Sequence, residues 1–164
     1  MPASPNCQLT MASTDLALDV IIRADVETVF EAVVDWQAQG EWMLGTWVRP
    51  VDGDGRGVGA KLEAFTGVGA AGFLDTMTIT LWDPPRRVDV LHTGKVVRGT
   101  GAMEVIALPN GYSRFVWSES LDLPLGLIGR LGWPLAKWPF LYGVRRSLTT
   151  FAKLVEAGRL PTSR

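Results

Sequence analysis

The sequence has only one cysteine and one histidine among its 164 residues, and this scarcity excludes several classes of site. Cys7 has no second cysteine to pair with, so an internal disulfide and a cysteine-based metal site are both excluded. Because His92 is the only imidazole, a zinc site of the usual kind is excluded too. The sequence also lacks a G-x-S-x-G motif, the usual turn for a catalytic serine. We therefore predict no metal ion, and nothing in the sequence indicates a cofactor.

The sequence also lacks an excess of either positive or negative charge. The 16 basic and 17 acidic residues give a net charge of -1, and only Arg86-Arg87 and Arg145-Arg146 are adjacent basic pairs. Proteins that bind nucleic acids usually carry a concentrated basic patch. We therefore expect no nucleic-acid partner, and a role on the ribosome is disfavoured for the same reason.

The first residues show none of the features of a secretory signal. Residues 1–13 are small and polar, without a basic start or a continuous apolar segment. We expect them to form a flexible tail, with Met1 or Met11 as the true start, and we expect the protein to be cytoplasmic. The remaining chain, 14–160, is predicted to be one domain, because a chain of this length buries roughly two-thirds of its unfolded surface.

A strand and a short helix are predicted near the start. Apolar residues alternate from Leu16 to Ile22, which is typical of a strand. Asp25 is a suitable helix N-cap, and apolar residues follow it at helical spacing as far as Val34. A second helical turn is expected over Gln37–Met43.

The middle of the chain shows only strand and turn patterns. A glycine-rich loop is predicted at 67–72, and the GDGRGVG segment at 53–59 is predicted to be a hairpin turn, because a strand and not a helix follows it. The six predicted strands are Thr46–Val51, Ala60–Thr66, Leu74–Trp82, Arg86–His92, Val96–Leu108 and Tyr112–Leu121. With the first strand, they make about seven.

The last segment is apolar but irregular. Glycines and two prolines within 125–139 should interrupt a helix, so a regular helix is predicted to begin near Pro139 and to end at Gly158. Its predicted inward stripe consists of Phe140, Val144, Leu148, Phe151 and Val155.

With these features the chain resembles members of the SRPBCC superfamily, also called START-like or Bet v 1-like. Within it, the chain resembles the polyketide cyclase/dehydrase and lipid-transport group. The resemblance covers residues 14–158, and its motifs are Ala24–Glu27 with Val29-Phe30, Asp35, Glu41-Trp42, Trp82–Val88 and Tyr112–Glu119. It implies an α+β helix-grip fold, in which a seven-stranded curved antiparallel sheet wraps around a long C-terminal helix, with two short helices after the first strand. It also implies an internal tunnel for a hydrophobic ligand.

The alternation along the strands places three ionisable side chains on the concave face of such a sheet. If Met77, Ile79 and Leu81 face the helix, Asp75 faces it as well. The same reasoning places His92 with Val88 and Val90, and Glu119 with Phe115 and Trp117. Asp75, His92 and Glu119 are therefore candidate acid–base residues. The alternatives are a polar anchor for a ligand and solvated residues at the sheet rim.

The predicted ligand-binding wall combines these strands with the final helix. Trp36 and Trp42 are expected to be core residues. The predicted wall consists of Leu62, Ala64, Met77, Ile79, Val90, His92, Met103, Phe115, Trp117, Glu119, Phe140, Val144 and Leu148.

Two functions follow as hypotheses. The first is non-enzymatic binding or transport of a hydrophobic small molecule such as a lipid or polyketide. The alternative is a polyketide aromatase/cyclase or dehydratase that uses Glu119 and His92. Residues 125–139 are interpreted as the entrance to the tunnel or as a transient membrane-surface contact, which would make the protein peripheral to a membrane. Self-association of the same segment into a homodimer is a further alternative.

Overall fold

The computed structural model describes residues 13–122 and 126–162. The elements in chain order are β1 (Ser13–Ile22), α1 (Val26–Val33), η1 (Trp36–Glu41), β2 (Thr46–Pro50), β3 (Lys61–Val68), β4 (Ala71–Asp83), β5 (Arg87–His92), β6 (Gly99–Leu108), η2 (Pro109–Gly111), β7 (Tyr112–Asp122) and α2 (Gly126–Glu156). Most of the predicted tail, 1–13, lies outside the described residues. No helix in the described ranges is long and apolar enough to span a bilayer.

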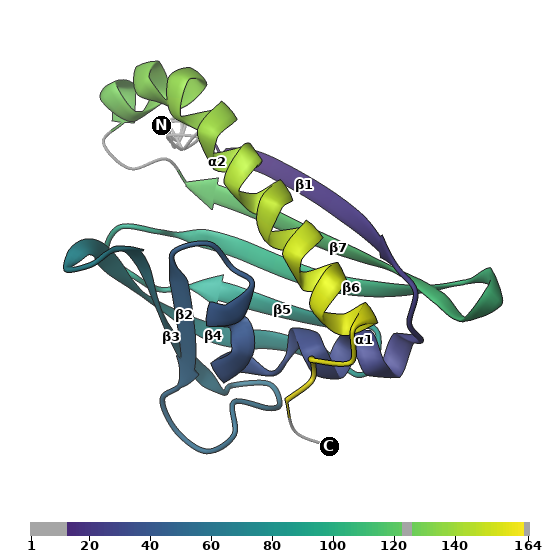
Figure 1. Ribbon diagram of the computed structural model, residues 1–164. Coiled ribbons are helices and arrows are strands. Elements are labelled where there is room, and N and C mark those ends of the chain that lie inside the picture. The colour runs from purple at the N-terminus through teal and green to yellow at the C-terminus, as the bar shows by residue number, and fades with distance from the viewer. Residues whose placement is uncertain (1–12, 123–125, 163–164) are drawn as a thin grey trace, which may run out of the picture.

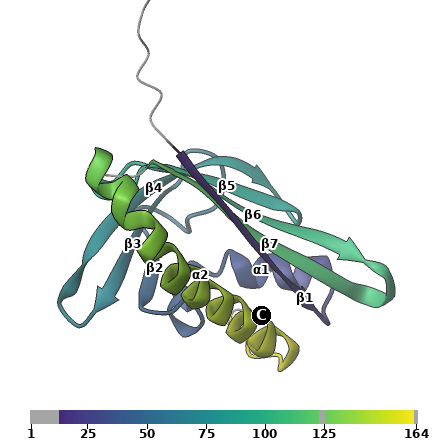
Figure 2. The ribbon, with the colours of Figure 1, turned by 90° about the horizontal axis from the view of Figure 1, so that it is seen from above.

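All seven strands form one antiparallel sheet in the order β1-β7-β6-β5-β4-β3-β2. From β2 to β7, strands that follow one another in the chain are neighbours in the sheet. β1 pairs with the free edge of β7. The sheet curves around α2, while α1 and η1 lie at one end of it (Figures 1 and 2). The predicted α+β helix-grip fold is therefore confirmed.

The predicted capping of the first helix is also confirmed. The Asp25 side chain accepts a hydrogen bond of 2.7 Å from the Thr28 backbone N–H, which satisfies a donor that the first helical turn leaves free. The helix then buries one face against the sheet, where the ring of Phe30 meets Trp82 edge-on at 5.8 Å. This packing fixes α1 across one end of the concave face.

The C-terminal half of α2 is packed tightly against the sheet. Trp42, Phe115 and Phe151 form an aromatic cluster with centroid separations of 4.8 to 6.4 Å. Leu148 and Val155 of α2 are buried beside them. Aromatic rings bury large apolar areas, so this cluster supplies much of the core. The space between helix and sheet is filled around Phe151, and it opens from Leu148 toward the start of α2.

One strand prediction is wrong because of a β-bulge. The register between β4 and β5 shifts between Ile79 and Leu81. A bulge inserts one residue and reverses the alternation that follows it. Leu81 is therefore 37% exposed instead of facing the helix, and Trp82 packs against the core in its place.

The boundaries of several elements also differ from the prediction. The predicted loop at 67–72 is a tight hairpin, because Gly67 and Gly72 pair directly within the strands and a side chain at either position would collide with the other strand. β6 begins at Gly99 and not at Val96, which leaves 93–98 as a loop.

The start of the last helix was also predicted wrongly. α2 is continuous from Gly126 and contains both Pro134 and Pro139, although the sequence predicted a beginning near Pro139. A proline inside a helix removes one backbone hydrogen bond and normally kinks or breaks it. The carbonyl that Pro139 leaves without a partner belongs to Leu135, which is 82% exposed, so water can hydrate it.

Candidate functional site

A pocket of about 300 Å³ lies between the sheet and the middle of α2. Its wall is formed by η1, strands β2 to β7 and α2, and it is predominantly apolar. The predicted wall residues that line it are Leu62, Ala64, Met77, Val90, His92, Met103, Trp117, Glu119, Phe140, Val144 and Leu148. Ile79 and Phe115 do not line the pocket, because both are buried in the core beside it.

Some residues of this wall were missed or placed elsewhere by the sequence analysis. Trp36 and Trp42 are buried core residues, as expected, and each also exposes a surface to the pocket. Phe140 was predicted to be on the inward stripe of α2, yet it is 38% exposed and reaches the pocket from its rim, beside Trp117 and Trp133.

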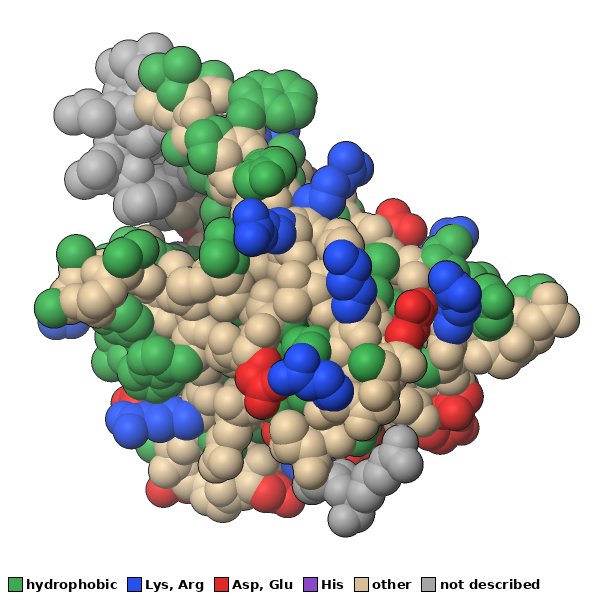
Figure 3. All heavy atoms as spheres, in the orientation of Figure 1, with side chains coloured by type: hydrophobic (Ala, Val, Ile, Leu, Met, Phe, Trp, Pro, Cys, Tyr) green, Lys and Arg blue, Asp and Glu red, His purple; other side chains and the backbone are tan. Residues whose placement is uncertain are grey.

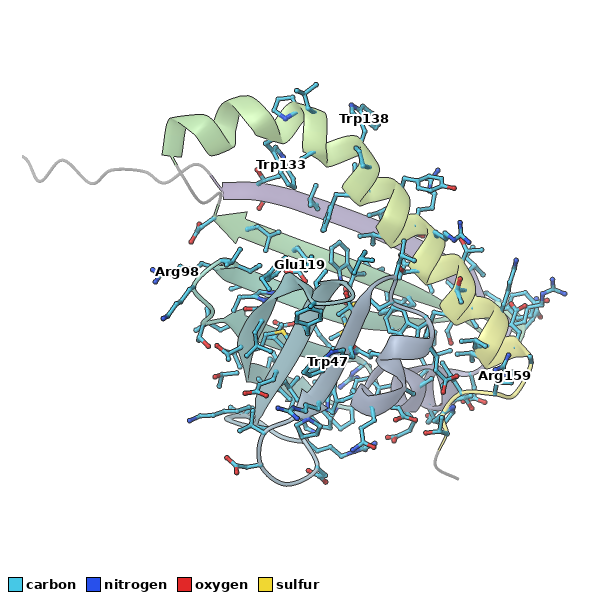
Figure 4. All side chains as sticks on the ribbon, turned by 60° about the vertical axis from the view of Figure 1, so that its left-hand side comes forward. Trp47, Arg98, Glu119, Trp133, Trp138 and Arg159 are labelled. Carbon is cyan, nitrogen blue, oxygen red and sulfur yellow. The ribbon has the colours of Figure 1, made fainter. Side chains whose placement is uncertain are left out.

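The structure brings the three ionisable candidates together at this pocket. Asp75 comes from β4, His92 from the end of β5 and Glu119 from β7, all on the concave face. Nδ1 of His92 lies 2.6 Å from Oδ2 of Asp75, and Nε2 lies 2.9 Å from Oε2 of Glu119. The three side chains are 7 to 11% exposed. Figure 4 shows Glu119 between the sheet and α2, on the side of Trp133.

Glu119 reaches His92 because β6, the strand between β7 and β5, has a glycine at this place. Gly101 pairs with Glu119 across the sheet, and a Cβ at Gly101 would lie 2.8 Å from Oε1 of Glu119. Any larger residue would displace the carboxylate. Sequence reasoning missed Gly101, since its role depends on the register of three strands.

The two hydrogen bonds set how many protons the Asp75–His92–Glu119 cluster must hold to satisfy them. Each short N···O contact needs one proton between its two atoms, because a carboxylate oxygen and a bare imidazole nitrogen are both acceptors. Two protons shared by two carboxylates and one imidazole ring give a net charge of -1. The proton between His92 and Glu119 can rest on either partner, so the pair is able to accept or donate it.

The pKa of His92 reflects its two partners. Burial by itself lowers the pKa of His92, but the hydrogen bonds and negative charges of Asp75 and Glu119 outweigh burial and raise it to about 9. Burial also raises the pKa of Glu119, against the opposing effect of its bond to His92. Because His92 binds its proton more tightly in the folded state, its stabilising contribution is complete below its ordinary pKa of 6.5 and is lost as the pH rises through 9.

Two further polar atoms of the wall are buried without a hydrogen-bond partner among the described residues. They are Oδ1 of Asp75 and Nε1 of Trp42. A buried donor or acceptor that makes no hydrogen bond costs about 1–3 kcal/mol. Both residues line the pocket, but these two atoms are themselves covered by the surrounding chain.

The cluster is not arranged as a metal site. Within the part of the chain that the structure describes, no group of three or more His, Cys, Asp or Glu side chains is placed to hold a metal ion. Both ring nitrogens of His92 already face carboxylates. The cluster is therefore suited to proton transfer and hydrogen bonding.

Comparison with known proteins agrees with this architecture. The model of one protein family, described as polyketide cyclase/dehydrase and lipid transport, matches residues 13–156. The chain belongs to this family. The fold is thus one that binds hydrophobic ligands, since polyketides and lipids are the molecules by which the family is described. No curated protein matches the chain.

Solved structures share the fold at low sequence identity. TTHA0849 from Thermus thermophilus is 15% identical, with a TM-score of 0.74 over 88% of this chain and 99% of the other. The ZhuI aromatase/cyclase from Streptomyces sp. R1128 is 15% identical, with a TM-score of 0.70 over 93% and 99% of the two chains. The Aha1 dimer from Colwellia psychrerythraea is 15% identical, with a TM-score of 0.59 over 88% and 98%.

The state of His92 can be measured directly, because the chain has no other histidine. We predict that nitrogen-detected NMR of the untagged protein shows both ring nitrogens protonated at pH 7, with a titration midpoint near 9. In Glu119→Gln the midpoint should fall, because one of the two negative charges that raise the pKa is lost. A midpoint near the ordinary value of 6.5 in the wild type would contradict the cluster as described.

Proposed function

We propose that the protein reversibly binds a small hydrophobic molecule in this pocket and does not transform it. The observation that carries the proposal is a cavity of about 300 Å³ whose apolar wall contains one buried polar cluster. Ligand pockets typically combine such a wall with a few placed polar groups that orient the guest. Affinity comes from burial of apolar area, at about 25 cal/mol per Å². Membership of a family described by lipid transport supports the same function.

Acid–base catalysis is the second candidate, and one observation favours it. Nε2 of His92 shares a proton with Glu119 over 2.9 Å inside the cavity. A base that removes a proton next to a carbonyl, and an acid that protonates a departing hydroxyl, are the groups that dehydration or ring closure of a poly-β-ketone chain requires. The likeness to an aromatase/cyclase structure supports this candidate.

The outer face of α2 supports a transient contact with a membrane. Between Gly126 and Val155 the helix has five basic residues and no acidic one, whereas the rest of the chain is net acidic. Leu135, Trp138 and Tyr142 are 82, 74 and 68% exposed at helical spacing. Figure 3 shows hydrophobic side chains over the start of α2 and basic ones further along it. Exposed aromatic residues beside cations are typical of helices that lie on anionic bilayers.

Blocking the cavity tests the binding proposal. Ala64 lines the pocket and is 6% exposed, so Ala64→Phe should fill it. We predict that this variant binds the neutral fluorescent probe N-phenyl-1-naphthylamine at least about tenfold more weakly than the wild type, because apolar area that the probe would bury is occupied. Ala107→Phe, at an exposed position near the end of β6 that does not line the pocket, is the matched control and should bind normally. A folded Ala64→Phe protein with unchanged affinity would refute binding in this pocket.

If the protein is a catalyst, formation of a reaction product can be measured. If the cluster acts as acid and base, the protein should dehydrate a long-chain β-hydroxy ketone to the enone, followed by ultraviolet absorbance. Glu119→Gln should then reduce kcat roughly 100-fold or more, since it removes the proton-transfer partner. Glu104→Gln, which changes a carboxylate on the outer face, should retain the rate. A ligand that binds but yields no product would leave binding as the function.

Membrane contact is tested by cosedimentation with vesicles. We predict binding to vesicles that contain about one-third phosphatidylglycerol and little binding to pure phosphatidylcholine, because the basic helix attracts anionic headgroups. Trp138→Ala should weaken it, whereas Trp47→Ala, at an exposed tryptophan on β2, should not. A failure to bind anionic vesicles, together with a dimer in analytical ultracentrifugation that Trp138→Ala dissociates, would assign this face to self-association instead.

A further inference from the structure

The charge inside the pocket comes from a single cluster. Among the described residues of the wall, Asp75, His92 and Glu119 are the only Asp, Glu, His, Lys, Arg or Tyr side chains. The wall therefore carries no lysine or arginine within the described part of the chain. With one proton in each of the two hydrogen bonds of the His92 ring, the cluster has a net charge of -1, and the pocket is anionic.

An anionic pocket of this kind opposes an anionic ligand. A carboxylate that entered would lie close to two other carboxylates, and His92 is already bonded to both of them. Burying an ionised group without a new partner is costly, and like charges in a poorly hydrated space add to the cost. The ligand's own carboxylate would have to lose its hydration without gaining an ion pair.

The same cluster offers a hydrogen-bond acceptor to a ligand whose polar end is a donor. Oε2 of Glu119 is bonded to His92, but Oε1 accepts no hydrogen bond from the described residues. The carboxylate lies over Gly101, where the missing side chain leaves it room, and Glu119 faces the pocket. A hydroxyl or ammonium group at this place can donate to Oε1 without disturbing the bond to His92.

We propose that the pocket selects hydrophobic molecules whose polar end donates a hydrogen bond, namely alcohols, phenols or protonated amines, and that it rejects carboxylates. This selectivity rests on the proposed binding function. Glu119 is the residue that determines it, through both its acceptor oxygen and its share of the negative charge. A free fatty acid is accordingly a poor ligand, while the alcohol or amine of equal chain length is a good one.

A matched set of ligands tests the proposal on the full-length chain. 1-Decanol, decylamine and decanoate share one tail and differ only in the head group, and each would compete with N-phenyl-1-naphthylamine at pH 7.5. We expect decanol and decylamine to displace the probe at concentrations at least about tenfold lower than decanoate, given the strength of charge interactions in a poorly hydrated site. Decanoate that competes as well as decanol would overturn the proposal.

Substitution of the cluster separates its charge from general hydrophobicity. Glu119→Gln removes one negative charge with little change of shape, so decanoate should approach decanol in potency and decylamine should lose its advantage. Glu104→Gln makes the same change in total charge on the outer face and should leave the wild-type order intact. An unchanged order in Glu119→Gln would overturn the role of Glu119. Failure of the probe and all three ligands to bind the wild type would instead overturn the binding function, and the selectivity with it.

Discussion

A carboxylate can be buried only where another charge or a set of hydrogen bonds replaces the water that it loses. In this protein two carboxylates face one apolar pocket, and His92 is bonded to both. Its position at the end of β5 allows this, because Asp75 on the adjacent strand β4 and Glu119 on β7, two strands away, bond to different nitrogens of its ring. Removal of His92 would leave two like charges in a poorly hydrated space. The register of four strands and the chemistry of the pocket therefore depend on the same imidazole.

Stability and ligand binding occupy different parts of the same helix. The last turns of α2 are held by aromatic packing around Phe151, which leaves no room for a guest. The middle of the helix, from Pro139 to Leu148, passes over the pocket, and the part before it exposes Leu135 and Trp138 to solvent. Tight packing at one end allows the protein to keep an open cavity at the other, because the cost of an unfilled space is offset by the filled core.

Local patterns in the sequence were sufficient to predict much of the fold. The cap at Asp25 and the alternation along β7 are properties of adjacent residues, and both were predicted correctly. The alternation also placed Asp75, His92 and Glu119 on one face. It could not give their mutual distances, which depend on how neighbouring strands are aligned.

The errors arose where tertiary structure overrides a local pattern. The bulge after Ile79 turned Leu81 outward, and no residue type in β4 marks it. Gly101 has a role only because Glu119 crosses it from the next strand. The prolines of α2 were predicted to interrupt the helix, but the carbonyl that Pro139 leaves unpaired, on Leu135, is open to water.

Pro139 also affects how firmly the rim of the cavity is held. Pro139 provides no N–H for the carbonyl four residues earlier, so the helix has lost part of its internal bonding at the point where it leaves the core. In the part of α2 before Pro139, few of the described side chains are buried, whereas Leu148 and Phe151 anchor the part after it. Displacing the part of α2 before Pro139, where Trp133 packs on Phe140 at the rim of the pocket, thus costs only a local opening, below the free energy of global unfolding. The rim of the cavity can therefore widen without loss of the fold.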